Sequence, residues 1–64
     1  MKVRDVLKRL KEDGWYVTNT EGDHRQLKND DKPGKVTVAG HPSDEVPPKT
    51  LNRIWDQAGL ERKR

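Results

Sequence analysis

The stretch WYVTNTEGDHRQLKNDDKPGKVTVA, residues 15–39, decides the fold, because three β-type segments alternate with two turn-type segments. Residues 15–20 are aromatic, β-branched and alternating, and residues 24–28 and 35–39 also have strand-like patterns. Residues 21–23 and 29–34 are rich in turn formers, and Gly22 can adopt a positive φ. Since connections this short place successive strands side by side, the stretch predicts a three-stranded antiparallel sheet.

An amphipathic helix is predicted on each side of this stretch. Apolar residues recur at i, i+3, i+4 and i+7 in both flanking segments, which is typical of a helix with one buried face. These residues are Val3, Val6, Leu7 and Leu10 in the first segment, and Leu51, Ile54, Trp55 and Ala58 in the second. The second helix is predicted from Pro48 to Ala58, after a loop over residues 40–48, with proline tolerated in its first turn. Gly14 and Gly59 suit the helix ends, and Leu60 is expected to fold back before the polar tail.

The predicted fold is one α+β domain over residues 1–64, in the order α-β-β-β-α. Two amphipathic helices need one apolar sheet face to cover, so both are expected on the same face of the sheet. A domain of 64 residues can enclose only one small core, so any chemistry is expected on its surface. Trp15 and Trp55 fall in the apolar patterns of their segments, which favours a core role over a nucleotide-stacking role.

Composition limits the possible classes of function. The chain has no cysteine, so a disulfide framework or a thiolate zinc site is excluded. The longest apolar run is Trp15–Val17, and the N-terminus lacks the apolar region of a signal peptide. Two histidines with scattered carboxylates match no metal-ligand motif. We therefore expect a soluble, cytoplasmic protein without a cofactor, metal or membrane partner.

The charge distribution argues against a simple phosphate-gripping surface. The net charge is +3, but residues 1–13 and 50–64 each carry +2, whereas residues 14–31 carry −2. A basic protein can bind nucleic acid, yet the central segment that contains His24 is acidic.

Strand alternation assigns side chains to the two faces of the predicted sheet. Leu27 is the only apolar residue of the middle strand, so it should point toward the helices. His24 is then expected on the opposite, polar face, and Arg25 on the helix side. The other residues assigned to the polar face are Gln26, Lys28, Tyr16, Thr18, Lys35 and Thr37. A β-bulge in the first hairpin would change this assignment.

The chain resembles the HicA toxins of bacterial type II toxin–antitoxin systems. The resemblance covers about residues 2 to 60 and runs through RDVLKRLKEDGW, GDHRQLKN, KPGKVTVAGHP and TLNRIWDQAGL in this order. It implies a fold like a double-stranded-RNA-binding domain. It also implies a ribonuclease that cleaves single-stranded mRNA without the ribosome and is blocked by a HicB-like antitoxin. The family's catalytic histidine lies in a Gly-Ser-His motif, which aligns with Gly22, Asp23 and His24.

The chain departs from the family pattern at four positions. Asp23 replaces the usual serine, and Leu27 replaces a large aromatic residue. An arginine is common near Asn19, and a proline is common at Ala39. Asp23 and Asn19 lie close to the implied site and make it more acidic than is typical of the family.

RNA cleavage without a metal needs proton transfer at the ribose 2′-hydroxyl and at the leaving 5′-oxygen. Imidazole suits both roles, because its unperturbed pKa of about 6.5 lies near neutral pH. We therefore interpret His24 as the catalytic acid or base, against the alternative of a solvated histidine on an exposed strand. His41 is either a second proton-transfer group or a structural loop residue. Asp23 either pairs with protonated His24 or caps the turn through its own backbone.

Several residues are candidates for RNA contacts, each with a simpler alternative. Lys28 and Lys35 could bind phosphate from the polar face or merely be solvated, and Arg25 could do so from an edge. Gln26 could contact a base or ribose, and Tyr16 could stack on a base or only cover the sheet. The sequence thus predicts a HicA-like mRNA endoribonuclease that acts without metal. The alternatives are a non-catalytic RNA-binding module and a degenerate toxin that only binds antitoxin.

Overall fold

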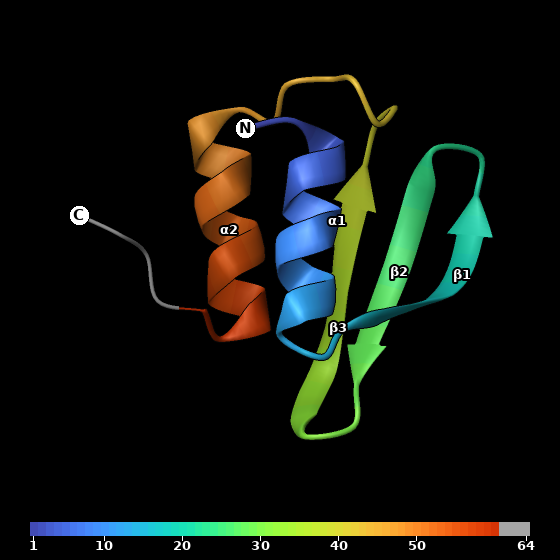
Figure 1. Cartoon of the computed structure of the whole chain (residues 1–64), viewed down its shortest axis with the longest axis vertical. Helices are drawn as coiled ribbons and strands as arrows, with labels where there is room; N and C mark the ends of the chain where they lie inside the picture. Colours follow the sequence, from blue (N-terminus) through green and yellow to red (C-terminus); the bar gives the residue numbers. More distant parts are fainter. Residues whose placement is uncertain (61–64) are drawn as a thin grey trace.

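The computed structural model describes residues 1–60 and confirms the α+β prediction. The elements follow in the predicted order (Figure 1). They are α1 (Val3–Glu12), β1 (Tyr16–Glu21), β2 (His24–Asn29), β3 (Lys32–Ala39) and α2 (Pro48–Ala58). The strands form one antiparallel sheet in the order β1-β2-β3. The predicted polar tail, residues 61–64, lies outside the described residues.

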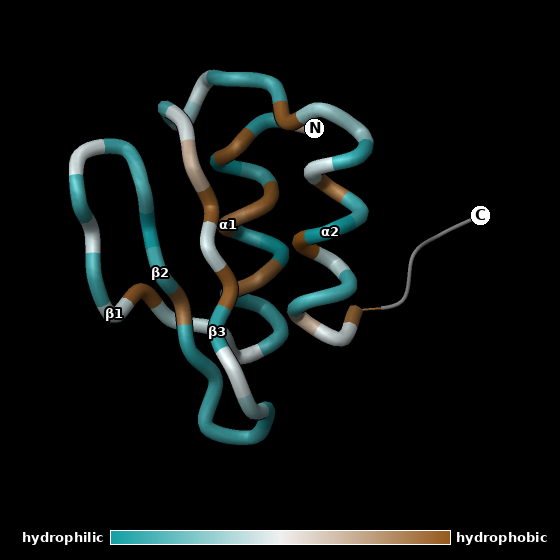
Figure 2. Tube along the Cα trace, turned by 180° about the vertical axis from the view of Figure 1, so that it is seen from behind, coloured by the Kyte–Doolittle hydropathy of each residue, from teal (hydrophilic) through white to brown (hydrophobic). Residues whose placement is uncertain are grey.

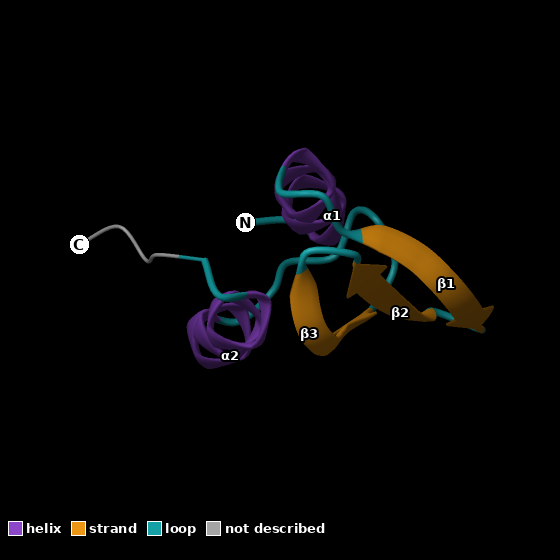
Figure 3. Ribbon diagram, turned by 90° about the horizontal axis from the view of Figure 1, so that it is seen from below, coloured by secondary structure: helices purple, strands orange, loops and turns teal. Residues whose placement is uncertain are grey.

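Both helices pack against the sheet face that carries Leu27, Val36 and Val38, each of which is fully buried. α2 lies along β3 at one end of the sheet, and β1 lies farthest from α2 (Figure 3). Apolar segments gather between the helices and β3, whereas the tip of the β1–β2 hairpin is hydrophilic (Figure 2). The remaining core residues are Val3, Val6, Leu10, Trp15, Val46, Ile54 and Ala58. The core therefore stabilises β3 and part of β2, and leaves β1 exposed on all six residues.

A β-bulge in β1 corrects one part of the face assignment. Val17 pairs with Leu27 as expected, but Asn19 rather than Thr18 pairs with Gln26. Thr18 is thus the additional residue of the bulge, and its hydroxyl donates a hydrogen bond to the Gln26 carbonyl at 3.3 Å. Beyond the bulge the alternation is inverted. Asn19 and Glu21 consequently lie on the same face as Gln26 and His24.

The second turn is shorter than the sequence predicted, because β3 begins at Lys32 and not at Lys35. Asn29 explains the difference. Its side-chain oxygen accepts a hydrogen bond from the Asp31 N–H, which closes the turn after two residues. Its side-chain nitrogen donates to the Asp13 carbonyl and so ties the turn to the end of α1. Pro33 is tolerated inside β3 because β3 is an edge strand.

Both predicted helix ends are confirmed. Gly14 and Gly59 have positive φ values of 96° and 68°. The Leu60 N–H donates to the Trp55 carbonyl at 2.9 Å, and Leu60 packs against the core. The chain therefore folds back after α2 as expected.

Lys32 links three elements at this end of the fold. Its ammonium donates to the Asp13 carboxylate after α1 and to the Ala58 carbonyl at the end of α2. The same carboxylate accepts a hydrogen bond from the Trp15 indole N–H at 3.2 Å. The hydrogen bond and charge of Lys32 lower the pKa of Asp13 below its ordinary value, against the opposing effect of partial burial.

Replacing Lys32 with methionine should lower the free energy of unfolding by about 1–2 kcal/mol at neutral pH. Because the folded-state pKa of Asp13 is depressed, the ion pair between Lys32 and Asp13 contributes its full stabilisation only above the unfolded-state pKa of Asp13. It is lost as the pH falls through the folded-state pKa. Urea unfolding should therefore show a larger difference between the parent and Lys32→Met at neutral pH than near pH 3, where the hydrogen bond of Lys32 to the Ala58 carbonyl remains. An equal effect of Lys35→Met, at an exposed position of the same strand, would contradict this assignment.

Candidate functional site

His24 is the first residue of β2 and follows directly on a two-residue turn. Its backbone pairs with Glu21 of β1 on one side and with Ala39 of β3 on the other. Gly22 has a positive φ of 57° and Asp23 does not, which is the pattern of a type II′ hairpin turn. A side chain at Gly22 would meet no atoms within 4 Å, so the turn requires glycine for its backbone conformation. The turn places the imidazole at one end of the sheet.

The Asp23 carboxylate lies close to the His24 imidazole. Asp23 Oδ1 lies 3.8 Å from His24 Nδ1, and the two side chains are 49% and 65% exposed. This contact is an ion pair only when the imidazole is protonated. The Asp23 carboxylate makes no hydrogen bond within residues 1–60, so the geometry favours the pairing alternative over capping of the turn.

The loop after β3 lies against the same turn. The Gly40 N–H donates to the Asp23 carbonyl at 2.9 Å, and Arg25 Nη1 donates to the Gly40 carbonyl at 3.0 Å. Gly40 has a φ of 112°, and a Cβ there would lie 3.3 Å from Val3, so this approach of the loop to α1 requires glycine. The segments that contain the two histidines are therefore adjacent, a point that the sequence left open.

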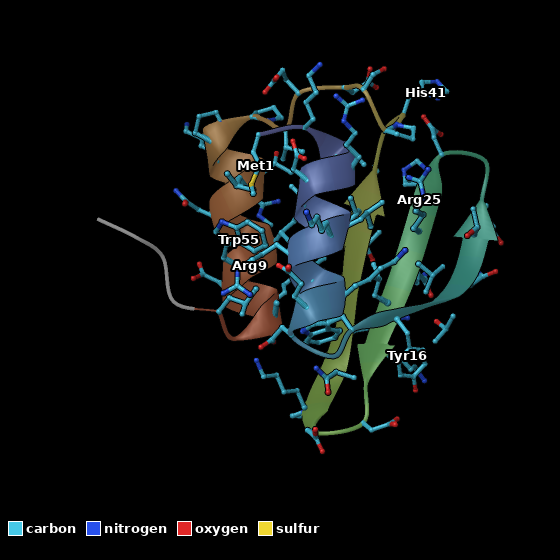
Figure 4. All side chains as sticks on the ribbon, in the orientation of Figure 1. Met1, Arg9, Tyr16, Arg25, His41 and Trp55 are labelled. Atoms are coloured by element: carbon cyan, nitrogen blue, oxygen red, sulfur yellow. The ribbon has the colours of Figure 1, made fainter. Side chains whose placement is uncertain are left out.

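His41 has an exposed side chain and a structured backbone. Its N–H donates to Asp44 Oδ2 at 3.0 Å, and its carbonyl accepts from the Asp44 N–H at 2.9 Å. Figure 4 shows His41 and Arg25 at the same end of the sheet, near the β1–β2 turn. These contacts support a structural role for the His41 backbone. They do not involve the imidazole, which stays free to contact a ligand.

Arg25 is half-buried, as expected for a residue on the helix side of β2. Its bond to Gly40 holds the loop against the hairpin, so it has a structural role in addition to the predicted RNA contact. Gln26, in the middle of the polar face, is half-buried between Asn19 and Thr37.

Tyr16, Lys28 and Lys35 lie at the opposite end of the sheet from His24. Tyr16 pairs with Lys28, four residues or about 13 Å along β2 from His24. The Tyr16 hydroxyl donates to Asp30 Oδ1 at 2.9 Å, and this hydrogen bond and the Asp30 charge raise the pKa of Tyr16. Tyr16 and both lysines are exposed. The structure thus separates the predicted site into a histidine end and a lysine end.

Sequence reasoning missed Glu21 as a neighbour of His24. We predicted Glu21 as part of the turn, whereas it is the last residue of β1 and pairs directly with His24. Directly paired side chains on one face have Cβ atoms about 5 Å apart. Two carboxylates, Glu21 and Asp23, therefore flank the imidazole. The only signal in the sequence was the negative charge of residues 14–31.

The exposed His24 imidazole can transfer a proton to or from a ligand that binds at the protein surface. The imidazole is exposed, and the loop after β3 is held against its turn by the Gly40 and Arg25 hydrogen bonds. Among residues 1–60, no group of three or more His, Cys, Asp or Glu side chains is placed to hold a metal ion. None of the helices described is long and apolar enough to cross a membrane.

Comparison with known proteins gives one match over most of the chain. The model of a family described as "HicA toxin of bacterial toxin-antitoxin" matches residues 3–60 of 64. No curated protein sequence matches the chain.

Proposed function

Because the chain belongs to the HicA toxin family of bacterial toxin–antitoxin systems, we propose that it is an mRNA endoribonuclease with His24 as its catalytic residue. The proposed enzyme acts in the cytoplasm, without the ribosome, as a single domain over residues 1–64. The observation that carries the proposal is the exposed His24 imidazole at a two-residue hairpin turn. The resemblance of GDHRQLKN to the family motif supports His24 as the equivalent of the family's catalytic histidine.

The proposed reaction is metal-independent cleavage by the ribose 2′-hydroxyl. A base removes the hydroxyl proton, the oxygen attacks the adjacent phosphorus, and an acid protonates the 5′-oxygen as its bond to phosphorus breaks. His24 transfers one of these protons, and the adjacent His41 is the candidate for the other. Arg25, on the helix side of β2, is the candidate to stabilise the additional charge on the phosphate from the edge of the sheet. The products are a 2′,3′-cyclic phosphate and a 5′-hydroxyl.

We assign the remaining RNA contacts to the polar face of the sheet. Gln26 lies between the two ends of that face and is placed to contact a base or ribose. Lys28 and Lys35 are exposed cations that can bind phosphates beyond the reacting one, and Tyr16 offers an exposed ring for stacking. The layered α-β-β-β-α arrangement supports the proposed likeness to a double-stranded-RNA-binding domain.

The ends of the products test the proposed reaction. Fragments of a long single-stranded mRNA, cut in excess EDTA, should carry a 2′,3′-cyclic phosphate and a 5′-hydroxyl that polynucleotide kinase labels directly. A 3′-hydroxyl product or a strict requirement for magnesium would contradict the mechanism.

The proposed protein partner is a HicB-like antitoxin that covers the polar face and His24. Family membership supports a partner of the antitoxin kind, and the exposure of His24 makes it accessible to such a protein. A complex in which the His24 imidazole stays accessible to solvent and RNA would contradict this mode of inhibition.

Replacing Asp23 with serine should lower the KM for RNA about fivefold at low salt. The substitution removes a negative charge 3.8 Å from His24. Because this carboxylate is about half exposed, its repulsion of a phosphate bound at His24 should be close to the value for charges about 4 Å apart in water, about 1 kcal/mol, which corresponds to about fivefold. Initial-rate measurements over a range of RNA concentrations would show the change. Asp31→Ser, at the turn between β2 and β3, is the matched control. An unchanged KM for Asp23→Ser, or an equal change in both variants, would contradict this role.

The flanking carboxylates also favour two alternatives on the same fold, a non-catalytic RNA-binding module and a degenerate toxin. Glu21 and Asp23 repel the phosphate that an enzyme must bring to His24. The two functions differ in a His24→Ala variant, because an enzyme loses cleavage and a binding module has no cleavage to lose. A degenerate toxin would bind antitoxin but show no salt-dependent RNA affinity.

A further inference from the structure

Three cations form a continuous basic stripe on α1. Arg4, Lys8 and Lys11 follow at i, i+4 and i+7, within an arc of about 60° at 100° per residue. All three are exposed, and their side chains form no ion pair or hydrogen bond within the described residues. Arg9 lies on the other flank of α1, which faces α2 in Figure 4. The basic stripe therefore lies on the flank away from α2.

The basic stripe ends close to the turn that carries His24. The Arg4 N–H donates to the Pro42 carbonyl at 3.1 Å, and two residues earlier the Gly40 N–H donates to the Asp23 carbonyl at 2.9 Å. Side chains of an α-helix lean toward its N-terminus, so all three cations lean toward the loop over residues 40–44. A chain bound along α1 would thus reach the site over this loop.

The immediate surroundings of His24 cannot supply the affinity that an RNA substrate needs. Glu21 and Asp23 flank the imidazole, and Lys28 is about 13 Å away along β2. Affinity for the RNA backbone depends mainly on the number of phosphates paired with cations. Within residues 1–60, the three cations of α1 form a row of positive charge whose N-terminal end is joined to the His24 turn through the loop over residues 40–42.

We propose that the basic stripe is a binding site for the RNA backbone that holds the substrate on one side of the reacting phosphate. The inference rests on the proposed function for its substrate class. Arg4 and Lys11 are seven residues apart, or about 10 Å along the axis, which is the length of roughly three stacked nucleotides. RNA enters along α1, crosses the loop over residues 40–42 and reaches His24 on the far face of the sheet.

The composition of the basic stripe favours RNA over a protein partner. The exposed large apolar residues of the described chain are Met1, Tyr16 and Val17, and none lies on the stripe. Protein interfaces are typically depleted of lysine and have an apolar centre. An exposed row of cations without apolar residues is instead typical of a surface that displaces counterions from a nucleic-acid backbone.

A binding measurement on non-cleaving protein tests this site separately from the enzymatic proposal. In the full chain with His24→Ala, Lys8→Gln/Lys11→Gln would be compared with Lys49→Gln/Arg53→Gln, which removes two exposed cations from α2. The probe is a fluorescein-labelled single-stranded RNA of mixed sequence, followed by anisotropy over a salt titration. Circular dichroism would verify that both variants are folded.

The α1 variant should bind RNA about tenfold more weakly at low salt. Its slope of log affinity against log salt should be shallower by about 1.4, or 0.7 for each lost phosphate contact. The α2 variant should change neither value. Equal losses in both variants, or an unchanged slope for the α1 variant, would overturn the proposal. So would an α1 variant that binds RNA normally but loses a HicB-like antitoxin, which would assign the stripe to the protein partner.

Discussion

Replacing His24 with alanine should reduce RNA cleavage at least 100-fold and leave RNA affinity within about twofold of the parent. A positioned general acid or base contributes about 10²- to 10⁴-fold to a rate, and His24 is the residue proposed for that role. The side chain is 65% exposed and makes no core contact, so its removal should leave the fold intact. The cleavage rate is measured with labelled mRNA under single-turnover conditions, and the RNA affinity is measured by fluorescence anisotropy.

His41→Ala is the matched control for this prediction. If His41 is the second proton-transfer group, its variant should also lose at least 100-fold in rate and flatten one limb of the pH profile. If its role is confined to the backbone bonds with Asp44, the rate should change by less than about threefold. In either case, a His24→Ala variant that cleaves RNA at the parental rate would contradict the assigned catalytic role.

Replacing Trp15 with alanine should destabilise the protein by about 3–5 kcal/mol, the range for large-to-small changes at buried aromatic residues. Trp15 is 2% exposed, is the largest of the fully buried side chains and joins α1 to the sheet. The substitution also removes the hydrogen bond that the Trp15 indole N–H donates to the Asp13 carboxylate at 3.2 Å. A 64-residue domain has a total stability of only about 3–10 kcal/mol, so much of the variant should be unfolded at room temperature.

Trp55→Ala is the control, because it removes the same side chain from a half-buried position. Thermal and urea unfolding, followed by circular dichroism, should show a loss for Trp55→Ala of less than half that for Trp15→Ala. Equal losses, or a folded Trp15→Ala protein that has instead lost RNA affinity, would contradict the core role of Trp15.

The fold was predictable because several local signals agree. The i, i+3, i+4, i+7 apolar spacing, the glycines at both helix ends and the position of Leu27 lead to the same layered arrangement. The bulge at Thr18 was not predictable, because the register that leaves Thr18 unpaired depends on the pairing of β1 with β2. The early start of β3 depends on the local bond between the Asp31 N–H and the Asn29 side chain, and on the bond of Asn29 to the Asp13 carbonyl. Only the folded chain brings Asn29 and Asp13 together.

The candidate site was predictable only in part. His24 is identified by the resemblance of GDHRQLKN to the family motif, and the choice of the polar face follows from Leu27. Glu21 becomes a neighbour of His24 only through the bulge, which inverts the alternation of β1. The proximity of the His41 segment depends on the contacts of Gly40 with Asp23 and Arg25, across 15 or more residues of sequence. Long-range contacts of this kind leave no periodic signal.

The most direct test of the central proposal is cleavage of a long single-stranded mRNA by the purified protein, without ribosomes and in excess EDTA, beside a folded His24→Ala variant. The expected result is cleavage by the parent and none by the variant. Cleavage by neither, from folded protein that carries no antitoxin, would contradict the enzymatic proposal and favour the binding module or degenerate toxin.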